Sequence, residues 1–172
     1  DDILYVVTNT VPNYWLMREG EEVELRPQLF DSKDEALTHV AIDKISIFPG
    51  SNEANYTIIS AIDLNEYETA EMKVETYLGA GSGIYMSTEA IYMTAPVYMP
   101  LAASTGLAMD SAMLVMNNNT ELYKFAVDGT NIEMTARTTI EGSVLNQFSM
   151  DEYNGYLRVA TTTGNAWGSE GD

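Results

Sequence analysis

The chain of 172 residues has no cysteine and a single histidine, His39. The lack of cysteine excludes disulfides, thiolate metal sites and thiol catalysis within this sequence. One histidine excludes multi-histidine metal sites and leaves His39 as the single candidate base for a Ser-His-Asp triad. Because His39 follows an aperiodic stretch, a surface position is favoured over a catalytic one.

Basic residues are also scarce, with 8 Lys and Arg against 26 Asp and Glu and a formal net charge of −18. Nucleic acids and anionic membrane surfaces are recognised by basic patches, so both partners are disfavoured. No apolar run reaches the length of a membrane span, and no signal peptide is present, so we expect no membrane insertion in this segment. The acidic start, Asp1-Asp2, and the polar tail, residues 164–172, lead us to expect a piece of a longer polypeptide.

Strand signals dominate the rest of the sequence. About eleven short segments combine β-branched and aromatic residues between turn signals, which predicts an all-β chain. The clearest of them are residues 4–8, 40–47, 56–64, 72–78, 84–86, 91–93, 122–127, 132–140 and 156–163. The expected helix is limited to one turn, capped at Ser32 and running through Leu37.

An internal repeat organises these strands. LYVVTN at Leu4, AIYMTA at Ala90 and YLRVATT at Tyr156 align, and the last two follow an apolar strand and a polar corner. The period between the second and third copies is about 65 residues. Without the irregular insert it is closer to the ~40–50 residues of a propeller blade. Four antiparallel strands per repeat are typical of β-propeller blades.

The repeat predicts about two blades and the first strand of a third. Blade one spans residues 3–89 with a surface insert at 10–54, and blade two spans 90–152 with an insert at 96–116. Residues 156–163 form the first strand of the third blade, before the polar tail 164–172. Because so few blades leave edges and faces uncovered, we expect an open, sandwich-like arc that self-associates through its exposed edges.

The segment NQFSMDEYNGYLRVATTTG, which begins at Asn146, carries a family resemblance. Together with TELYKFAVDG before it and LYVVTN, YTIISAIDL and YLGAGSGIYMSTEAIYMTA in the first half, it resembles the secreted bacterial and archaeal β-propellers distantly related to WD40 repeats. The resemblance implies an exported or surface-attached propeller. It implies no catalytic residues, and a closed propeller of this family needs several more blades than this chain supplies.

The corner of Asp151, Glu152 and Asn154 is one candidate site. In a functional interpretation the two carboxylates and the Asn154 carbonyl bind Ca²⁺ or act as an acid–base pair. Adjacent strand residues point to opposite faces, which argues against a joint action on one substrate. The structural interpretation, in which Asp151 or Asn154 bonds the backbone and sets the corner, is favoured.

Asp128 and Asn131 form a second oxygen-rich span that loosely resembles a calcium loop. The span lacks the regular ligand spacing and the distant bidentate glutamate of the EF-hand, and Asp128-Gly129 is a typical hairpin turn. A plain turn is therefore favoured, and no metal or other cofactor is assigned.

Two residue types carry further alternatives. The clustered methionines from Met86 to Met116 could supply Cu(I) ligands, with Met113 to Met116 the place to look, but core filling is favoured in the absence of Cys and neighbouring His. The strand tyrosines could stack on sugars, although half-buried strand positions are their usual place.

These observations favour a non-catalytic part of an extracellular or cell-surface β-propeller that binds or scaffolds a protein or another surface ligand. The alternative is part of a carboxylate-based hydrolase or carbohydrate-active propeller, with a site completed by further blades.

Overall fold

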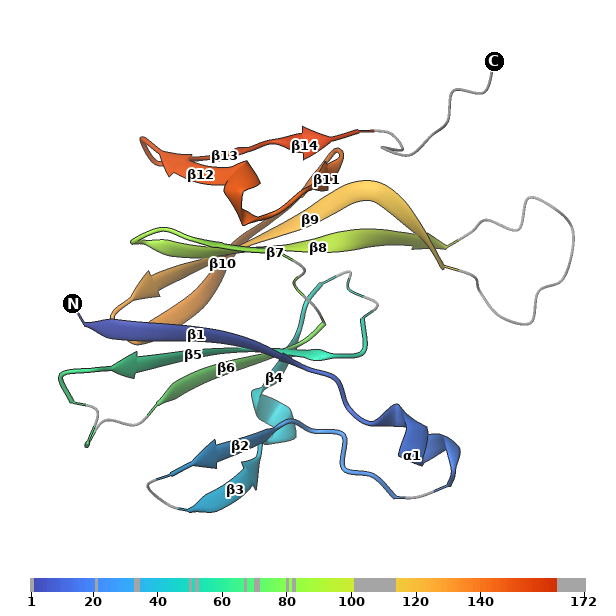
Figure 1. The fold of residues 1–172 in the computed structure, drawn as a ribbon, viewed down its shortest axis with the longest axis vertical. Coiled ribbons are helices and arrows are strands. Elements are labelled where there is room, and N and C mark those ends of the chain that lie inside the picture. Colours follow the sequence, from blue (N-terminus) through green and yellow to red (C-terminus); the bar gives the residue numbers. More distant parts are fainter. Residues whose placement is uncertain are drawn as a thin grey trace, which may run out of the picture. The chain divides into compact units, whose positions relative to one another are not determined.

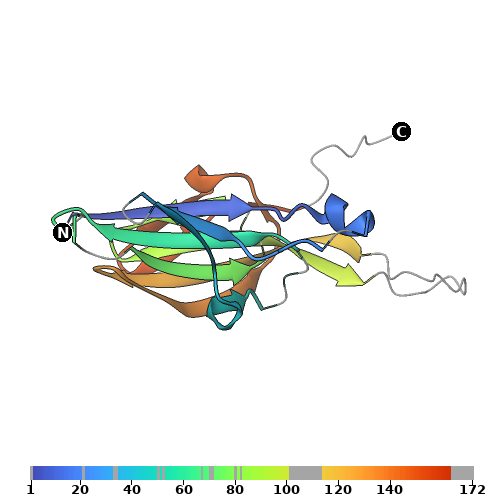
Figure 2. The same ribbon diagram turned by 90° about the horizontal axis from the view of Figure 1, so that it is seen from below.

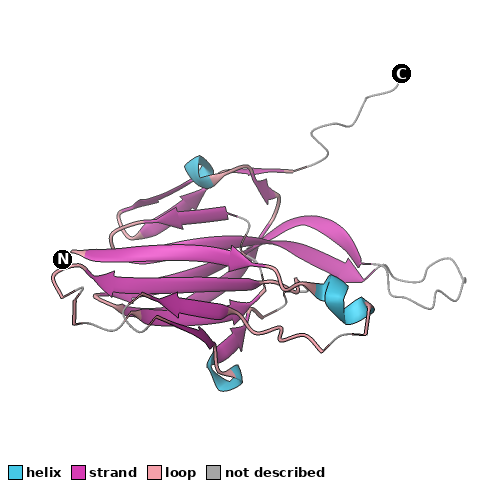
Figure 3. Ribbon diagram, turned by 60° about the horizontal axis from the view of Figure 1, so that its bottom comes forward, coloured by secondary structure: helices cyan, strands magenta, loops and turns pink. Residues whose placement is uncertain are grey.

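The computed structural model describes residues 2–20, 22–32, 35–49, 51, 53–66, 68–69, 72–79, 81, 83–100 and 114–163, and most of them are strand (Figure 1). Within them, helix is confined to α1 (Tyr14–Arg18) and two 3-10 turns, η1 (Ile42–Lys44) and η2 (Gln147–Ser149), as Figure 3 shows. None of these described helices has the length or the apolar character to span a bilayer. The all-β prediction is confirmed.

The strands fall into two four-stranded sheets and three two-stranded pairings. They are β1 (Ile3–Thr10), β2 (Gln28–Asp31), β3 (Ala36–His39), β4 (Ile45–Ile47), β5 (Tyr56–Asp63), β6 (Lys73–Leu78), β7 (Gly83–Met86), β8 (Ala90–Pro100), β9 (Leu114–Asp128), β10 (Asn131–Ile140), β11 (Ser143–Val144), β12 (Met150–Tyr153), β13 (Tyr156–Val159) and β14 (Thr161–Thr162). The chain divides into two compact units, Asp1–Ala80 with Asp128–Ile132, and Gly81–Val127 with Glu133–Asp172.

The first sheet has the strand order β1-β5-β6-β4. Figure 2 shows β1, β5 and β6 side by side, and each of these pairs is antiparallel. Strand β5 lies in the interior of the sheet, and all residues from Tyr56 to Ala61 are buried. This burial explains why its sequence is apolar without alternation, as predicted.

The outer edge of this sheet is closed by β4, which pairs with β6 in parallel. Beyond β4, Phe48 is fully buried and stacks on Tyr77 of β6 with ring centroids 4.9 Å apart. The Phe48 backbone N–H also donates to the carbonyl of Leu78 at 3.0 Å. Two parallel strands cannot be joined by a tight hairpin, and here the chain passes through β5 between β4 and β6.

The second sheet has the order β10-β9-β8-β7, and its β7–β8 and β8–β9 pairs are antiparallel. It pairs strands in the order in which they follow one another. The predicted hairpin at Asp128-Gly129 is confirmed, since β9 ends at Asp128 and β10 begins at Asn131. Met93 and Tyr123 in its central strands are fully buried, so Met93 has the core role favoured for the methionines. Met86 at the edge of the sheet does not, because it is 43% exposed.

The described parts of the predicted insert 96–116 are strand rather than loop. Strand β8 continues through Pro100, and β9 begins at Leu114, with a register shift between Pro96 and Val97. Proline has no N–H for a strand ladder, and a bulge lets the pairing continue past it. Residues 101–113, including Met113, lie outside the described residues.

A smaller assembly follows the second sheet, in which β11 pairs with β14 and β12 with β13. It packs on the second sheet through a cluster formed by Tyr92, Leu122 and Met150, against which Leu157 and Val159 also pack. The apolar surface that this cluster buries stabilises the packing of the β12–β13 hairpin on the sheet, by ~25 cal/mol for each Å² removed from water. The predicted tail 164–172 lies outside the described residues.

The helical turn predicted from Ser32 to Leu37 is wrong. Of the described residues in this range, Ser32 and Glu35 lie in the turn of the β2–β3 hairpin, and Ala36 and Leu37 belong to β3. Leu37 pairs with Phe30, and Glu35 has a positive φ of 48°. Lys33 and Asp34 lie outside the described residues. A single helical turn fixes several dihedral angles for one hydrogen bond, whereas the hairpin gains a ladder of them. The predicted strand at 40–47 is also shorter, because η1 occupies its first half.

The strand pairings cross both predicted blade boundaries. Strand β7 pairs with β8 across residue 89, and β12 pairs with β13 across residue 152. Short corners make antiparallel neighbours of the strands that they join, so the strand before each corner shares a sheet with the strand after it. The limits of the blades themselves, 3–89 and 90–152, stay a prediction.

Candidate functional site

The acidic corner of the β12–β13 hairpin is a tight turn. Asn154 and Gly155 have φ values of 51° and 77°, both in the left-handed region. Two successive positive φ values match the type I′ hairpin turn, for which Asn-Gly is the favoured pair. Asn154 therefore has a conformational role at this corner, as the structural interpretation predicted.

Asp151 forms an ion pair with Arg158, its register partner across the hairpin. The Arg158 Nε donates to Asp151 Oδ1 at 2.9 Å, and Nη2 contacts Oδ2. The Arg158 guanidinium also lies over the Tyr153 ring, 4.9 Å from its centroid. The hydrogen bonds from Arg158 lower the pKa of Asp151, and they engage both of its carboxylate oxygens.

Glu152 occupies the opposite face of β12. Its backbone N–H donates to the Tyr85 hydroxyl oxygen at 3.0 Å, and its Oε2 is buried without a hydrogen-bond partner among the described residues. Asp151, by contrast, is exposed. The alternation of a strand thus separates the two carboxylates, and the geometry gives them no joint site.

Asp128 and Asn131 flank the turn of the β9–β10 hairpin, where Gly129 has a φ of 56°. In the described part of the chain, no three His, Asp or Glu side chains are placed to hold a metal ion. Calcium binding at Asp128, Asn131, Asp151, Glu152 or Asn154, the alternative that the sequence disfavours, stays untested.

The sequence did not predict the hollow that the connection between β1 and β5 encloses in the first unit. Its volume is about 420 Å³. It is lined by Thr10, Pro12, Glu24, Leu25, Arg26, Pro27, Gln28, Phe30, Leu37 and Tyr56. The signal that could have indicated it is the segment ELRPQ, since an extended chain brings its residues 24, 26 and 28 to one face.

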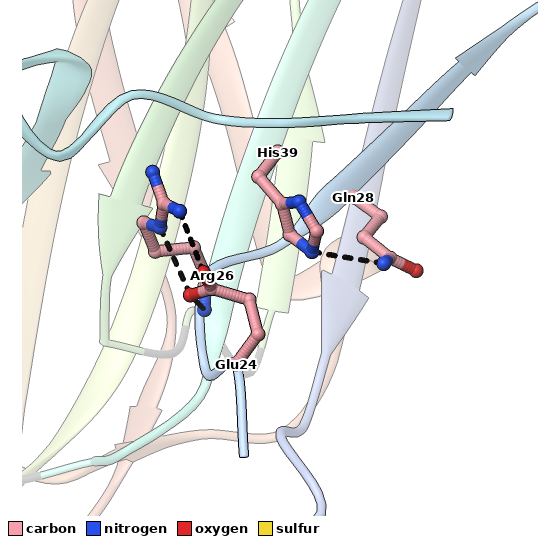
Figure 4. A network of polar contacts seen from close by, with 4 residues as sticks. All are labelled: Glu24, Arg26, Gln28 and His39. Atoms are coloured by element: carbon pink, nitrogen blue, oxygen red, sulfur yellow. Dashed lines mark hydrogen bonds and ion pairs between the residues drawn. The ribbon is translucent and has the colours of Figure 1, made fainter. Parts of the chain in front are cut away.

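Glu24 and Arg26 form a local clamp at this hollow (Figure 4). The guanidinium of Arg26 donates from Nε to Oε1 of Glu24 at 2.9 Å and from Nη2 to Oε2 at 2.6 Å, and the Arg26 backbone N–H adds a bond of 3.0 Å. The hydrogen bonds from the Arg26 side chain, and then from its backbone, lower the pKa of Glu24 to about 2. The carboxylate is thus held both ionised and oriented.

Gln28 and His39 lie opposite each other at the start of β2 and the end of β3 (Figure 4). Their Nε2 atoms are 2.9 Å apart. Because an amide nitrogen is only a donor, Gln28 donates and the His39 Nε2 accepts in this arrangement. The predicted surface position of His39 agrees with its exposure.

The apolar wall of the hollow comes from the same hairpin. Phe30 and Leu37 pair directly across β2 and β3, and they are 62% and 57% exposed. Two large apolar side chains that face solvent together form a small apolar surface, which marks candidate binding sites more often than a single one does. The clamp of Glu24 and Arg26 and the apolar surface of Phe30 and Leu37 therefore border the same hollow.

A second hollow of about 240 Å³ lies in the second unit, between the sheet and the β12–β13 hairpin. Its lining includes Tyr92, Lys124, Arg137 and Tyr156. Lys124 Nζ lies 5.5 Å from the centroid of the Tyr92 ring, and the Arg137 guanidinium is bonded to Glu121 at 2.8 Å. Its two cations are thus held by neighbouring side chains, and the hollow in the first unit offers the richer set of exposed groups.

Comparison with known proteins identifies the family to which this chain belongs. The sequence profile described as "Beta propeller domain" matches residues 1–172. The chain belongs to the β-propeller domain family. This membership confirms the predicted β-propeller family, and the predominantly antiparallel strand pairing agrees with it.

Two archaeal proteins are similar to parts of this propeller domain. An uncharacterized protein from Archaeoglobus fulgidus is 49% identical over 43 residues, which are 25% of this chain and 6% of that protein. An uncharacterized protein from Methanocaldococcus jannaschii is 72% identical over 25 residues, or 14% of this chain and 4% of that protein. The matched segments are thus a small part of both relatives, and no solved structure matches the chain.

Proposed function

We propose that this propeller domain acts in binding or scaffolding, within an exported or cell-surface protein. The observation that carries the proposal is the hollow of about 420 Å³ in the first unit, which the β1–β5 connection builds outside the regular sheet. Binding residues are often carried by connections that a rigid scaffold positions. The resemblance to secreted propellers supports the extracellular location.

The contacts of the titratable groups favour binding over catalysis. A general acid or base works best when its pKa is near the working pH, whereas the pKa of Glu24 is lowered to about 2. His39 is engaged by Gln28, and Asp151 by Arg158. These groups are arranged to hold one another, which suits a fixed recognition surface.

The edges of the hairpins support a scaffolding component. Strand β8 has β7 on one side and β9 on the other, whereas β13, which follows the equivalent corner, pairs only with β12 among the described residues. An unpaired edge offers a row of backbone donors and acceptors to another strand. The partner is a further repeat or a second copy of the chain.

One observation favours the catalytic alternative, namely the buried and unpartnered Oε2 of Glu152. A buried polar atom without a hydrogen-bond partner calls for an explanation, and a functional role is one such explanation. The hydrolase hypothesis therefore rests on Glu152 alone, and Asp151 serves as its matched control because it lies on the other face of β12.

The test combines envelope binding with an activity screen. The labelled 172-residue chain is incubated with washed cell envelopes from the source organism, and the same chain is assayed on chromogenic glycosides and esters. We expect saturable binding without turnover. Turnover that Glu152→Gln abolishes and Asp151→Asn preserves would establish the hydrolase hypothesis instead.

A further inference from the structure

The hollow in the first unit has the size and composition of a small-ligand site. Its volume of about 420 Å³ lies in the range of known ligand pockets. Ligand pockets combine apolar walls with a few polar groups in fixed positions. Here the polar groups of Glu24, Arg26 and Gln28 and the exposed apolar side chains of Phe30 and Leu37 line the same hollow.

The polar side is oriented before any ligand arrives. Arg26 uses two guanidinium N–H groups for Glu24, and a guanidinium carries five, so others remain to donate. The Gln28 amide donates one N–H to His39 and keeps its carbonyl oxygen as an acceptor. Donors and acceptors fixed in this way lose little conformational freedom on binding, which favours affinity.

The apolar side is formed by flat or rigid side chains. Phe30 presents an aromatic ring that is 62% exposed, and Leu37 lies beside it. Pro12 and Pro27 line the same hollow, and Tyr56, which is 8% exposed, contributes to it from the buried strand β5. A ligand that matches this hollow has an apolar face and an edge rich in hydrogen-bonding groups.

The charge of the site selects among such ligands. The charges of Glu24 and Arg26 cancel each other in their ion pair, and the Gln28 amide donates to His39. The net charge of −18 repels polyanions at long range. A metal ion would have to displace Arg26 from both oxygens of Glu24.

We propose that the hollow binds a neutral oligosaccharide, an inference that rests on the proposed binding function and names its ligand class. A pyranose ring has a C–H face that packs on Phe30 and Leu37. Its hydroxyl groups donate to the Gln28 carbonyl oxygen and accept from Arg26. Glu24 acts as a positioning residue, because it fixes the guanidinium rather than contacting the sugar.

The test uses the 172-residue chain and calorimetric titration with soluble neutral hexasaccharides of glucose, mannose, galactose and N-acetylglucosamine, and with a hexamer of uronic acid. At least one neutral hexasaccharide is expected to bind, and the uronic acid hexamer more weakly. Phe30→Ala and Gln28→Ala are expected to weaken binding by at least about tenfold, as for residues at the centre of an interface. Phe148→Ala is the matched control, since Phe148 is 87% exposed in η2 of the other unit, and its effect is expected to stay below about twofold.

Three results would overturn the proposal: no heat with any neutral hexasaccharide, equal affinity in the chain and its Phe30 and Gln28 variants, or an equal loss in the Phe148 variant. Thermal unfolding of each variant checks that the fold is retained, which the exposure of Phe30 predicts. If the 172-residue chain binds envelopes but no saccharide, the ligand class is rejected and the proposed binding function stands. If the chain binds neither envelopes nor saccharides, the proposed function is rejected as well.

Discussion

The two four-stranded sheets share a three-stranded centre and differ at their edges. Strands β1, β5 and β6 of the first sheet correspond to β8, β9 and β10 of the second. The fourth strand of the first sheet is β4, which joins β6 in parallel, whereas that of the second is β7, which joins β8 on the opposite side. The repeat thus specifies three antiparallel strands, and each sheet obtains its fourth from a different part of the chain.

A buried threonine–glycine contact marks the shared centre. The Thr57 hydroxyl donates to the Gly79 carbonyl at 2.9 Å, and the Thr120 hydroxyl donates to the Gly142 carbonyl at 2.8 Å. In each pair the glycine follows the threonine by 22 residues and has a positive φ, 120° for Gly79 and 88° for Gly142. The two sheets therefore close the β-meander with the same contact.

The largest expected effect comes from adding a methyl group to these glycines. A Cβ on Gly142 would lie 2.8 Å from the Thr162 carbonyl oxygen, and one on Gly79 would lie 2.7 Å from the Ser51 Oγ. The steric clash and the strained φ together predict a loss of about 2–4 kcal/mol in the free energy of unfolding for each alanine variant. The loss is expected to be larger for Gly142, because the backbone oxygen of Thr162 can move away less easily than the Ser51 side chain.

Urea denaturation measures these losses. Gly20→Ala is the matched control, since Gly20 has a φ of 81° and open space around it, so strain alone acts there. It is expected to cost about 1 kcal/mol. A loss at Gly142 no larger than at Gly20 would contradict the role of the close contact.

The next effect concerns one position at which the two sheets differ in a titratable group. Two positions before its glycine, the first sheet has Tyr77 and the second has Ile140. Burial, and then the Glu75 carboxylate, raise the pKa of Tyr77 to about 12. Since the folded state keeps this proton after the unfolded chain has lost it near pH 10, the stability is intact below pH 10 and falls as the pH rises toward 12, by up to about 1.4 kcal/mol per pH unit.

Urea denaturation at pH values from 9 to 12 tests this expectation. Tyr77→Phe removes the titrating group and is expected to flatten the fall in stability. Tyr156→Phe is the control, because Tyr156 is 75% exposed. An equal slope in the Tyr77 variant and the unmodified chain would show that other groups cause the alkaline loss.

The smallest effect concerns one threonine in each sheet, three positions before the glycine. Thr139 donates to Oε1 of Glu121 at 2.8 Å. Thr76, which is the register partner of Ile58, has a buried hydroxyl without a hydrogen-bond partner among the described residues. Thr139→Val is expected to cost about 0.5–1.5 kcal/mol. Thr76→Val is expected to be neutral or stabilising, because it removes an unpaired buried polar group.

Thermal unfolding of both valine variants measures this difference. Burial of Glu121 acts to raise its pKa, but the hydrogen bonds from Arg137 and Thr139 outweigh it, so the pKa is lowered. The contribution of Thr139 is therefore present above the ordinary pKa of a glutamate and is lost as the pH falls. A similar loss in both variants at neutral pH would show that the two positions are equivalent after all.

The local features of this chain were predictable because they depend on neighbouring residues. β-Branched and aromatic residues identified β5, β8 and β10, and the Asn154-Gly155 pair identified its corner. The clamp of Glu24 and Arg26 is equally local, yet its partners in the hollow are not. Phe30 and Leu37 line it only because a hairpin formed where the capping pattern at Ser32 predicted a helical turn.

The sequence alone determined that the chain is all-β, that it repeats, and where its tight hairpins turn, because alternation and positive φ are properties of a few adjacent residues. Only the tertiary structure decided which strand completes each sheet, which carboxylate faces Arg158, and which side chains enclose the hollow. The physical reason is that strand pairing can join backbone groups far apart in the sequence, and nothing local to β4 specifies that it will extend the sheet beside β6.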